Sequence, residues 1–541
     1  MNRSVIDKSS LLPPSLSIRH ARQNVNSLCI FNELAISLDL TRADWAVILG
    51  SMIEHVHHRC TEITLAGPFW RLPEACKSQW LALLDSALPG ARLGRWSFLL
   101  PDPNLIVEAH AARSPRGLHL QRRDAAGEWH TGFLPGDPLA LIDNLRSERG
   151  QPFSDTVPFP FRSGAVGWFG HGTGRFIEDL SETVPDRDGL PDLRLLFGDV
   201  VLAHRPDDGS TWLNCTGRGP SAAIAEQRSE ELTEHWRDLV TSFCPPVLPE
   251  LPTGSSQAKW TADLDGQAYA EAVASIQQDI HAGRVFEVNM TQTLQADLMA
   301  DPWTLYRILR ETNPAPFAAY IRTPDATIVS SSPERYLKLD ASRRVESRPI
   351  KGTRPRSDDR AVDNRLHDEL AGSLKDMAEN IMIVDLVRSD IGRVCNIGSV
   401  RVPELCAVEG YATVWQMVST IEGQLGAGKT AMDLIRACHP PGSMTGAPKI
   451  EALKVIDELE TSRRSVYAGG IGYLDDGGGM DLHVVIRTVV VQDGVCRFGV
   501  GGAVTADSNP QDEYEETMDK ARALVRAIGM ANAMTKRPPE P

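Results

Sequence analysis

Short apolar runs alternate with Gly- and Pro-containing turns over residues 61–202, as in RSGAVGWFGH and LRLLFGDVVLAH. Runs of this length between turn residues predict a strand-rich region with few long helices. The hydrophobic period then changes, and residues 222–243 are predicted to form an amphipathic helix. The Pro-rich segment CPPVLPELPTGSS at 244–256 follows, and we interpret it as a linker or a crossing between domains.

Beyond Lys259 the patterns of helices and strands are mixed. Helices are predicted over residues 269–283, 376–388 and 512–529, and strands over 285–295 and on both sides of the turn in ATIVSSSPERYLKLD. Residues 483–504 indicate a β-hairpin, because two β-branched runs are joined by Asp493-Gly494. These elements follow one another without a regular βαβ rhythm, so we expect packed sheets with outer helices rather than a doubly wound fold.

The composition limits the class of protein. The chain has 541 residues, 42% of them apolar, which excludes a wholly disordered chain. Its formal net charge of −15 argues against nucleic acid or an anionic membrane held by overall charge. No apolar run reaches the roughly 18 residues of a membrane span, and Asp7 and Lys8 stand where a signal peptide would be apolar. Nine cysteines without a CxxC pair indicate a reducing compartment, so we expect a soluble cytoplasmic protein without disulfides or structural zinc.

Residues 423–430 (GQLGAGKT) fit the GxxxxGK[ST] pattern of a phosphate-binding loop, and they precede a helix-like segment. An NTPase would also need a Walker-B strand that ends in aspartate, normally downstream. The best match ends at Asp385, upstream and inside a helical pattern. The alternative is a glycine-rich connecting loop with a capping lysine, and we favour it because matches to so short a motif arise by chance.

Two pairs of carboxylates at i, i+3 spacing are a second candidate site, although they match no named motif. Asp376 and Glu379 share one face of a predicted helix, and Glu513 and Glu516 share a face of another. Two such helices facing each other would gather oxygen ligands of the kind that Mg²⁺ prefers. The alternative is a solvated helix face, since Lys520 lies four residues beyond Glu516.

Three further positions carry candidate chemistry. Arg487 is expected mid-strand, where its guanidinium must meet an anion, either a substrate carboxylate or a structural aspartate. Lys351 stands among Gly and Pro residues, and desolvation or the nearby Arg348 and Arg354 could remove its proton and make it a nucleophile. The loop PPGSMTGAPK at 440–449 precedes a helix, as is typical of an anion-binding helix end.

Nine separated blocks, taken in order, resemble the chorismate-utilising enzymes related to anthranilate synthase component I, and among them the aminodeoxychorismate synthases. The blocks are SSPERYL, RPIKGTRPR, AENIMIVDLVRSDIGRV, RVPELCAVEG, VSTI, CHPPGSMTGAPK, YAGGIGYL, IRTVVV and GGAVTADSNPQDEYEETMDKA. They cover residues 259–529 densely, and the region before residue 245 resembles the N-terminal part of the family more loosely. Agreement of many blocks in one order is far more specific than a single motif.

The resemblance implies an α+β fold of two packed, mainly antiparallel β-sheets with helices on the outside. It implies that residues 61–256 are an N-terminal component I-like region ending in the Pro-rich linker, and that residues 257–530 are the chorismate-binding catalytic region. Residues 1–60 are then an extension without a predicted role, and residues 531–541 a tail. In the extension, EHVHHRC holds three histidines, which we interpret as isolated residues on a helix surface because no second pair of metal ligands lies at a useful spacing.

The resemblance also implies the residues of the site. Glu379 and Glu516 match the two Mg²⁺ ligands of the family, with Asp376 and Glu513 as further acidic residues of the metal site. The positions that match chorismate-holding residues are Gly352, Thr353, Ser443, Tyr467, Arg487, Gly501, Gly502 and Lys520.

Two residues match the catalytic positions of the family. Glu334 matches the proposed general acid/base beside the departing hydroxyl. Lys351 stands at a position that is lysine in aminodeoxychorismate synthases and alanine in anthranilate synthases. The resemblance implies that this lysine attacks C2 of chorismate while the C4 hydroxyl leaves, and that ammonia then adds at C4 and expels the lysine.

The implied activity is the Mg²⁺-dependent amination of chorismate to 4-amino-4-deoxychorismate, for p-aminobenzoate and folate synthesis. No cysteine lies in a GxCxGxQ-type nucleophile elbow, so ammonia is expected from a separate glutamine amidotransferase subunit or free from solution. The alternatives are anthranilate synthase component I, a P-loop NTPase and a non-catalytic regulatory subunit. A non-catalytic regulatory subunit is disfavoured because the residues at the catalytic and metal positions are intact: Glu334, Lys351, Glu379 and Glu516.

The sequence departs from the pattern of the family at three places. Gln416 replaces a histidine that many relatives carry, and Glu287 stands where a glutamine is common. Isochorismate and salicylate synthases carry at the latter position a lysine that activates water, so its absence speaks against those activities. Residues 313–320 (NPAPFAAY) resemble a segment that binds tryptophan in relatives, with Ala318 in place of a bulkier residue.

Overall fold

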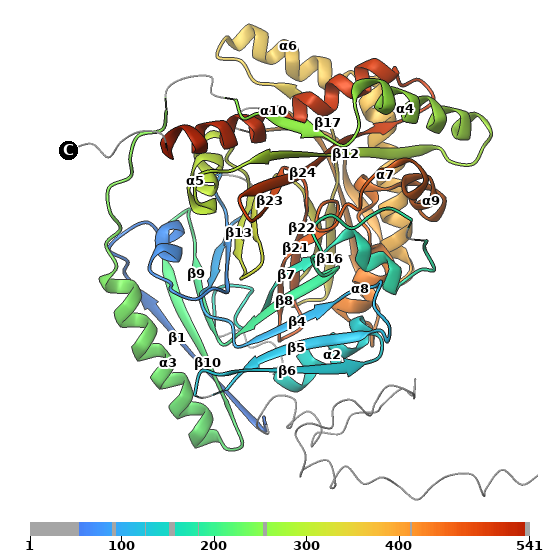
Figure 1. Cartoon of the computed structure of the whole chain (residues 1–541). Helices are drawn as coiled ribbons and strands as arrows, with labels where there is room; N and C mark the ends of the chain where they lie inside the picture. Colours follow the sequence, from blue (N-terminus) through green and yellow to red (C-terminus); the bar gives the residue numbers. More distant parts are fainter. Residues whose placement is uncertain are drawn as a thin grey trace, which may run out of the picture. The chain divides into compact units, whose positions relative to one another are not determined.

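Two large antiparallel sheets pack face to face and carry helices on their outer sides (Figure 1). The computed structural model describes residues 53–88, 93–124, 126–150, 157–181, 183–252, 257–411 and 414–535. All of them lie in one compact unit that spans Leu40–Pro541. Most of the predicted extension (1–52), the end of the predicted linker (253–256) and most of the predicted tail (536–541) lie outside the described residues.

The first sheet combines strands from both ends of the chain. Its order is β1 (His55–Ile63), β10 (Thr211–Gly219), β9 (Val200–His204), β3 (Ser97–Leu100), β2 (Leu81–Asp85), β13 (Phe317–Arg322), β14 (Thr327–Ser332), β23 (Thr488–Gln492), β24 (Val495–Val504), β12 (Glu287–Asp297) and β11 (Trp260–Ala262), with β20 (Gly446–Ala447) paired to β12. The predicted turn at Asp493-Gly494 joins β23 to β24, with Gln492 opposite Val495.

The second sheet is built in the same way. Its order is β17 (Ile350–Pro355), β19 (Val414–Gln424), β16 (Arg344–Arg348), β15 (Arg335–Leu339), β22 (Met480–Val484), β21 (Gly470–Asp475), β7 (Gly164–Phe169), β8 (Leu193–Gly198), β4 (Leu105–Ala109), β5 (Gly117–Arg123) and β6 (Trp129–Pro135), with β18 (Arg401–Gly410) paired to β19. Both sheets contain strands from either side of residue 257, so the predicted boundary there divides the sequence and not the sheets.

One of the hydrophobic cores fills the space between the two sheets. Phe98 of β3 and Ile328 of β14 come from the first sheet, and Trp168 of β7 and Tyr473 of β21 come from the second. The rings of Phe98 and Tyr473 lie 5.4 Å apart in an edge-on arrangement. Burial of large side chains between sheets gives the hydrophobic stabilisation that fixes the sandwich.

Nine α-helices cover the outer faces within the described residues. They are α2 (Pro138–Arg149), α3 (Ala222–Ser242), α4 (Gly266–His281), α5 (Pro302–Thr312), α6 (Arg360–Ala371), α7 (Leu374–Gly392), α8 (Ala431–Cys438), α9 (Lys449–Leu459) and α10 (Pro510–Thr535). Helix α10 packs on β24 and on α4 and α5, whereas α7 packs on β19 and β17 of the other sheet. The predicted α+β fold with outer helices is therefore confirmed.

Two local predictions are wrong. The EHVHHRC segment is not helical: from His55 it forms β1, in which alternate residues face opposite sides, and His57 and His58 form hydrogen bonds with Ser229 and Thr216. Arg487 is not mid-strand either, because the chain leaves the second sheet after β22 and enters the first at β23. Arg487 lies in that crossing with φ 49°.

None of the helices in the described part of the chain combines the length and the apolar character needed to cross a membrane. All eight described cysteines are free thiols.

Candidate active site

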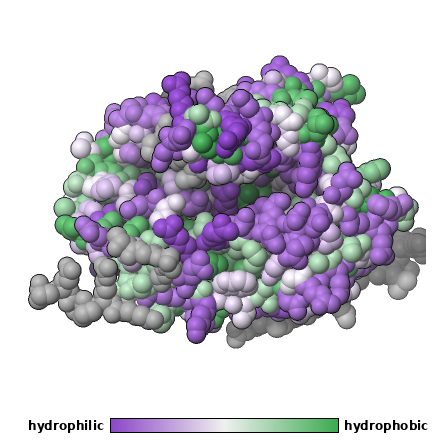
Figure 2. Space-filling view, turned by 90° about the horizontal axis from the view of Figure 1, so that it is seen from above, coloured by the Kyte–Doolittle hydropathy of each residue, from purple (hydrophilic) through white to green (hydrophobic). Residues whose placement is uncertain are grey.

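The predicted site residues come from elements of both sheets and from two outer helices. Strand β17 carries Lys351, α7 carries Glu379, and α10 carries Glu516; in Figure 1 these elements gather in the upper part of the molecule. Viewed from above, this face is largely hydrophilic and is hollowed near its centre (Figure 2).

Lys351 lies at an irregularity in β17. The pairing of β17 with β19 shifts register between Ile350 and Thr353, and Gly352 has φ 85°. A side-chain carbon at Gly352 would come within 2.9 Å of Asp376, so the close approach of β17 to α7 requires glycine there. The Lys351 side chain is 10% exposed, and its ammonium donates a hydrogen bond of 3.0 Å to Glu287 of β12.

The charges around Lys351 differ from the expectation. Burial lowers the pKa of the Lys351 ammonium, but Glu287, Glu379 and Glu334 together raise it above its ordinary value. The prediction that Arg348 and Arg354 lower this pKa is therefore wrong for the protein without metal or substrate. Both arginines are neutralised by other partners: Arg348 pairs with Glu409 at 2.5 Å, and Arg354 pairs with Glu369 at 2.7 Å.

Glu334 lies in the turn between β14 and β15 and is buried. Burial raises its pKa to about 7, although a hydrogen bond of 2.6 Å from the Ser443 hydroxyl and the charge of Lys351 act in the opposite direction. Arg487 is also close enough to Glu334 to favour its ionised form. A carboxyl group with a pKa near neutral pH can both donate and accept a proton, which suits general acid/base chemistry.

A cluster of carboxylates joins α7 to α10. Lys375 of α7 lies 3.5 Å from Glu513 and 3.9 Å from Glu379. Glu516 pairs with Lys520 at 2.7 Å, and Lys520 also donates to the Gly501 carbonyl at 2.8 Å. The two predicted helix faces therefore do meet.

These residues fit a divalent cation. Burial raises the pKa of Glu379 to about 7; Lys351 and Lys375 act in the opposite direction, and Glu287 and Glu516 act in the same direction as burial. A cation beside this carboxylate would favour its ionised form. Within the described ranges no group of three or more His, Cys, Asp and Glu side chains converges at metal-binding spacing. Mg²⁺ commonly takes one or two carboxylates and completes its shell with water and substrate oxygens, so Glu379 and Glu516 suffice as protein ligands.

The other residues predicted for the metal and substrate sites lie in differing surroundings. Asp376 pairs with Arg354 at 3.1 Å, which engages its carboxylate. Thr353 has an exposed side chain. The Tyr467 ring lies against β24, since a side-chain carbon at Gly499 would come within 2.2 Å of it. Gly502 faces the acidic cluster: a side-chain carbon there would come within 3.0 Å of Glu513.

Sequence reasoning missed two residues that organise the site. Lys375 supplies the cation nearest to Glu379 and Glu513, and its position four residues before Glu379 on one helix is the sequence feature that could have found it. Ser508 donates a hydrogen bond of 2.8 Å to Glu513 from the turn before α10. No pattern in the sequence indicates that contact.

The GQLGAGKT segment forms the connection from β19 to α8. Thr430 caps α8, and its hydroxyl accepts from the Asp433 amide at 3.2 Å while Asp433 accepts from the Thr430 amide at 3.0 Å. Lys429 lies 3.8 Å from Asp433. Asp385, the Walker-B candidate, lies on α7 with an exposed side chain. The segment is thus the connecting loop that was favoured from the sequence, but the residue that caps α8 is Thr430 and not the expected lysine.

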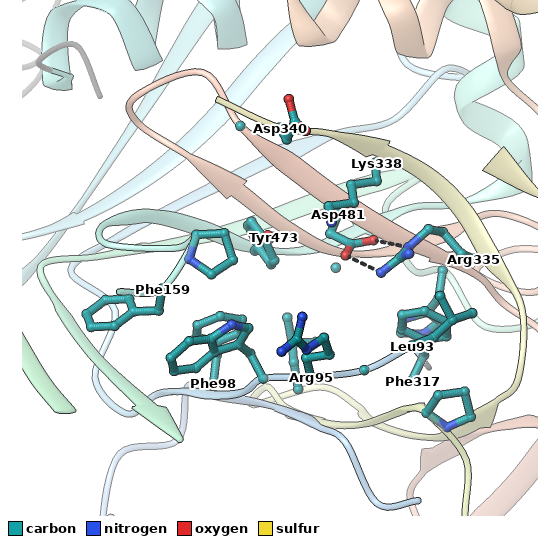
Figure 3. Close-up of a pocket in the computed structure, with 18 of the residues that line it drawn as sticks. Leu93, Arg95, Phe98, Phe159, Phe317, Arg335, Lys338, Asp340, Tyr473 and Asp481 are labelled. Carbon is teal, nitrogen blue, oxygen red and sulfur yellow. Dashed lines mark hydrogen bonds and ion pairs between the residues drawn. The ribbon is translucent and has the colours of Figure 1, made fainter. Parts of the chain in front are cut away.

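A cavity of about 540 Å³ lies apart from these residues, between the two sheets. It is lined by aromatic side chains, including Phe98 and Phe317, and by Arg335, which forms a double hydrogen bond with Asp481 at 2.9 and 3.1 Å (Figure 3). The segment at 313–320 contributes Pro316, Phe317 and Ala318 to its wall. None of the predicted site residues lines this cavity.

Comparisons with known proteins place the chain. The sequence model of a family described as chorismate binding enzyme matches residues 119–526. The chain is 41% identical to an aminodeoxychorismate synthase of Streptomyces pristinaespiralis over 73% of this chain and 55% of the relative. It is 37% identical to an aminodeoxychorismate synthase of Streptomyces griseus over 97% of this chain and 68% of the relative. The chain thus spans little more than half of the first relative and about two thirds of the second.

An anthranilate synthase component 1 of Thermus thermophilus is also 41% identical, over 69% of this chain and 79% of the relative. Among solved structures, anthranilate synthase component I from Streptococcus pneumoniae superposes with a TM-score of 0.66 and 26% identity, over 80% of this chain and 92% of that one. Overall identity therefore does not separate the two activities.

Proposed function

This chain belongs to the family of chorismate binding enzymes, and from that premise we propose that it aminates chorismate with ammonia to give 4-amino-4-deoxychorismate and water. The observation that carries the proposal is the position of Lys351. Its amine is buried, and the carboxylates of Glu287, Glu334 and Glu379 act on it. A lysine in such a place is within reach of a bound substrate.

Lys351 has the role of the nucleophile. A covalent bond from Nζ to C2 of chorismate divides the replacement of the C4 hydroxyl into two easier displacements. Anthranilate synthase component I is the alternative, and it is disfavoured because the resemblance gives alanine at this position in those enzymes.

Glu334 has the role of the acid that protonates the departing C4 hydroxyl. Its pKa of about 7 leaves a substantial protonated fraction at neutral pH, and the Ser443 hydroxyl orients its carboxyl group. Arg487 and Lys520 are the candidates for the substrate carboxylates. Among the described residues the Arg487 side chain makes no ion pair, which leaves its guanidinium available to an anion.

The fit of the acidic cluster supports Mg²⁺ as a cofactor held by Glu379 and Glu516, with Glu513 adjacent. When bound, the cation would neutralise these carboxylates and accept a carboxylate oxygen of the substrate. In the protein alone Lys375 lies beside Glu379 and Glu513, and Lys351 also favours the ionised form of Glu379.

Ammonia is proposed to come from a glutamine amidotransferase subunit, with free ammonium as a substitute. The described cysteines support this division of labour. Seven of the eight are partly or wholly buried, and burial raises the pKa of those thiols, which opposes the thiolate that a glutaminase requires; the exposed one is Cys244.

The test is product analysis. The purified chain is incubated with chorismate, Mg²⁺ and ammonium chloride, and the product is identified by mass spectrometry and by NMR, which distinguishes the C4 amine from its C2 isomer. We expect 4-amino-4-deoxychorismate. Formation of anthranilate, or no conversion, would contradict the proposal.

A further inference from the structure

Glu287 is in direct contact with Lys351, and the resemblance gives no role to a glutamate at this position. It is the first residue of β12, and it is completely buried. Its main chain is held in place: Glu287 pairs with Ala447 of β20, and a side-chain carbon at Gly446 would come within 2.1 Å of the Glu287 carbonyl oxygen. The Glu287 carboxylate is therefore fixed beside the Lys351 ammonium.

The two oxygens of this carboxylate are in different situations. Oε1 accepts the 3.0 Å hydrogen bond from Lys351 Nζ. Oε2 is buried and has no hydrogen-bond partner in the described part of the chain. A buried carboxylate with a single donor is poorly compensated, because each unmade hydrogen bond of a charged group costs free energy. Among the described residues, Lys351 Nζ is thus the one hydrogen-bond donor to the Glu287 carboxylate.

Lys351 is surrounded by negative charge. Glu287 of β12, Glu334 of the β14–β15 turn and Glu379 of α7 all favour its protonated form, and Glu516 of α10 also lies within electrostatic reach. The cation Lys375 stands next to Glu379. The resting side chain is thus an ammonium, whereas bond formation to carbon requires a free electron pair on Nζ.

We infer that Glu287 is the proton acceptor of Lys351. The inference rests on the proposed function. In the first step one N–H bond of the ammonium breaks, its electron pair stays on Nζ, and an O–H bond forms on Glu287 Oε1. Nζ then bonds to C2 of the substrate while the C4–O bond breaks, and the hydroxyl leaves as water with the proton of Glu334. When ammonia bonds to C4, the bond from C2 to Nζ breaks and its electron pair leaves with the departing amine. The proton then returns from Oε1 to Nζ, the new C4 ammonium gives one proton back to Glu334, and no proton is gained or lost by the protein over the cycle.

A second interpretation is that Glu287 only anchors Lys351. An anchor that stabilises the ammonium opposes the free amine, so its removal would accelerate the reaction or leave the rate unchanged. A proton acceptor is required for the reaction, so its removal slows it. The two interpretations therefore predict opposite effects for one substitution.

The substitution is Glu287→Gln, which keeps the size of the side chain and a hydrogen-bond acceptor but cannot take the proton. Glu271→Gln on the exposed face of α4 is the matched control, and Glu287→Asp is the conservative variant. For each, kcat and the KM for chorismate are measured from pH 6 to 9 with ammonium as the amine source. Thermal unfolding checks that each variant is folded.

For Glu287→Gln we expect kcat at pH 7 to fall at least about 100-fold, which is within the range of general base catalysis, with the KM for chorismate unchanged within about threefold. We expect its kcat to rise about tenfold per pH unit, because solvent must now take the proton, and Glu287→Asp to restore part of the activity with the wild-type pH profile. A Glu287→Gln enzyme with the wild-type kcat and pH profile, or a faster one, would overturn the inference while the proposed function stands. If the wild-type chain forms no 4-amino-4-deoxychorismate, both fall.

Discussion

Ser443 donates a hydrogen bond of 2.6 Å to Glu334, and it thereby stabilises the ionised form of a carboxyl group that burial would otherwise keep protonated. The two residues lie 109 positions apart, on η6 (Gly442–Met444) and in the β14–β15 turn. Their contact sets how much of the acid is available at neutral pH.

Replacement of Ser443 by alanine should raise the pKa of Glu334 above about 7. A hydrogen bond to a charged group contributes about 1.5 kcal/mol or more, which corresponds to about one pH unit. Because Glu334 must be protonated to donate, the basic limb of the kcat profile should move upward by about one unit. An unchanged basic limb would show that Glu334 is not the acid.

If Glu379 and Glu516 are the Mg²⁺ ligands, replacing either of them should weaken Mg²⁺ binding, and replacing a neighbouring glutamate should not. Glu379→Gln and Glu516→Gln should each raise the Mg²⁺ concentration for half-saturation by about tenfold or more, measured by calorimetry in the absence of substrate. Glu515→Gln is the matched control, because Glu515 lies next to Glu516 on α10 but is exposed and accepts a hydrogen bond from Gln511 on the same helix. Equal Mg²⁺ affinities for all four proteins would contradict the assignment of the ligands.

Glu379 should cost stability in the absence of metal. Its folded pKa of about 7 lies above its ordinary value of 4.5, so the folded state holds the proton more tightly than the unfolded chain does. The free energy of unfolding should therefore fall as the pH rises from about 4.5 to about 7 and stay lowered above that.

Glu379→Gln removes this cost. With a chelator present at pH 8 it should raise the free energy of unfolding by about 2 kcal/mol, with a much smaller change at pH 5, and the variant should lose activity. Urea unfolding at the two pH values makes the comparison. A variant that is less stable than the wild type at pH 8 would contradict the raised pKa.

The glycine-rich loop before α8 should act as a cap and not as a nucleotide site. Thr430→Ala removes a capping hydrogen bond and the contact of the hydroxyl with Asp143, so it should lower the free energy of unfolding by about 1 kcal/mol or more with kcat unchanged. Calorimetry should detect no binding of Mg-ATP to the wild type. Tight binding of Mg-ATP that Lys429→Ala abolishes would restore the NTPase interpretation.

The helical parts of the site were predictable because their evidence is local. The i, i+3 spacing of Glu513 and Glu516 fixes a shared face of α10 whatever the rest of the chain does. That α10 meets α7 is a property of the tertiary structure, since one helix packs on β24 of the first sheet and the other on β19 of the second. Only the resemblance indicated that the two carboxylate pairs belong together.

The position of Arg487 shows where hydrophobic patterning fails. Residues 484–491 are apolar except for Arg487 and Thr488, and strands buried on both faces show no alternation that would mark their ends. One long buried strand and two short buried strands joined by a crossing therefore give the same hydrophobic pattern. The crossing between the sheets, with a left-handed arginine, could not be predicted from it.

The contact between Glu287 and Lys351 was equally hidden. The two residues are 64 positions apart, and they lie on β12 of the first sheet and β17 of the second. The unusual residue at position 287 was visible in the sequence, but its partner was not. The nearby arginines in the sequence predict a lowered pKa for Lys351. The carboxylates of Glu287 and its neighbours raise this pKa instead, and their proximity is visible only in the structure.

The most direct test of the central claim is the rate of 4-amino-4-deoxychorismate formation by Lys351→Ala, measured with chorismate, Mg²⁺ and ammonium beside the wild type. Lys429→Ala, at an exposed lysine of the β19–α8 loop, is the control and should keep the wild-type rate. Because the account gives Lys351 a covalent role, Lys351→Ala should lose at least about 100-fold in kcat while it remains folded and binds chorismate. A folded Lys351→Ala enzyme that forms this product at the wild-type rate would contradict the account.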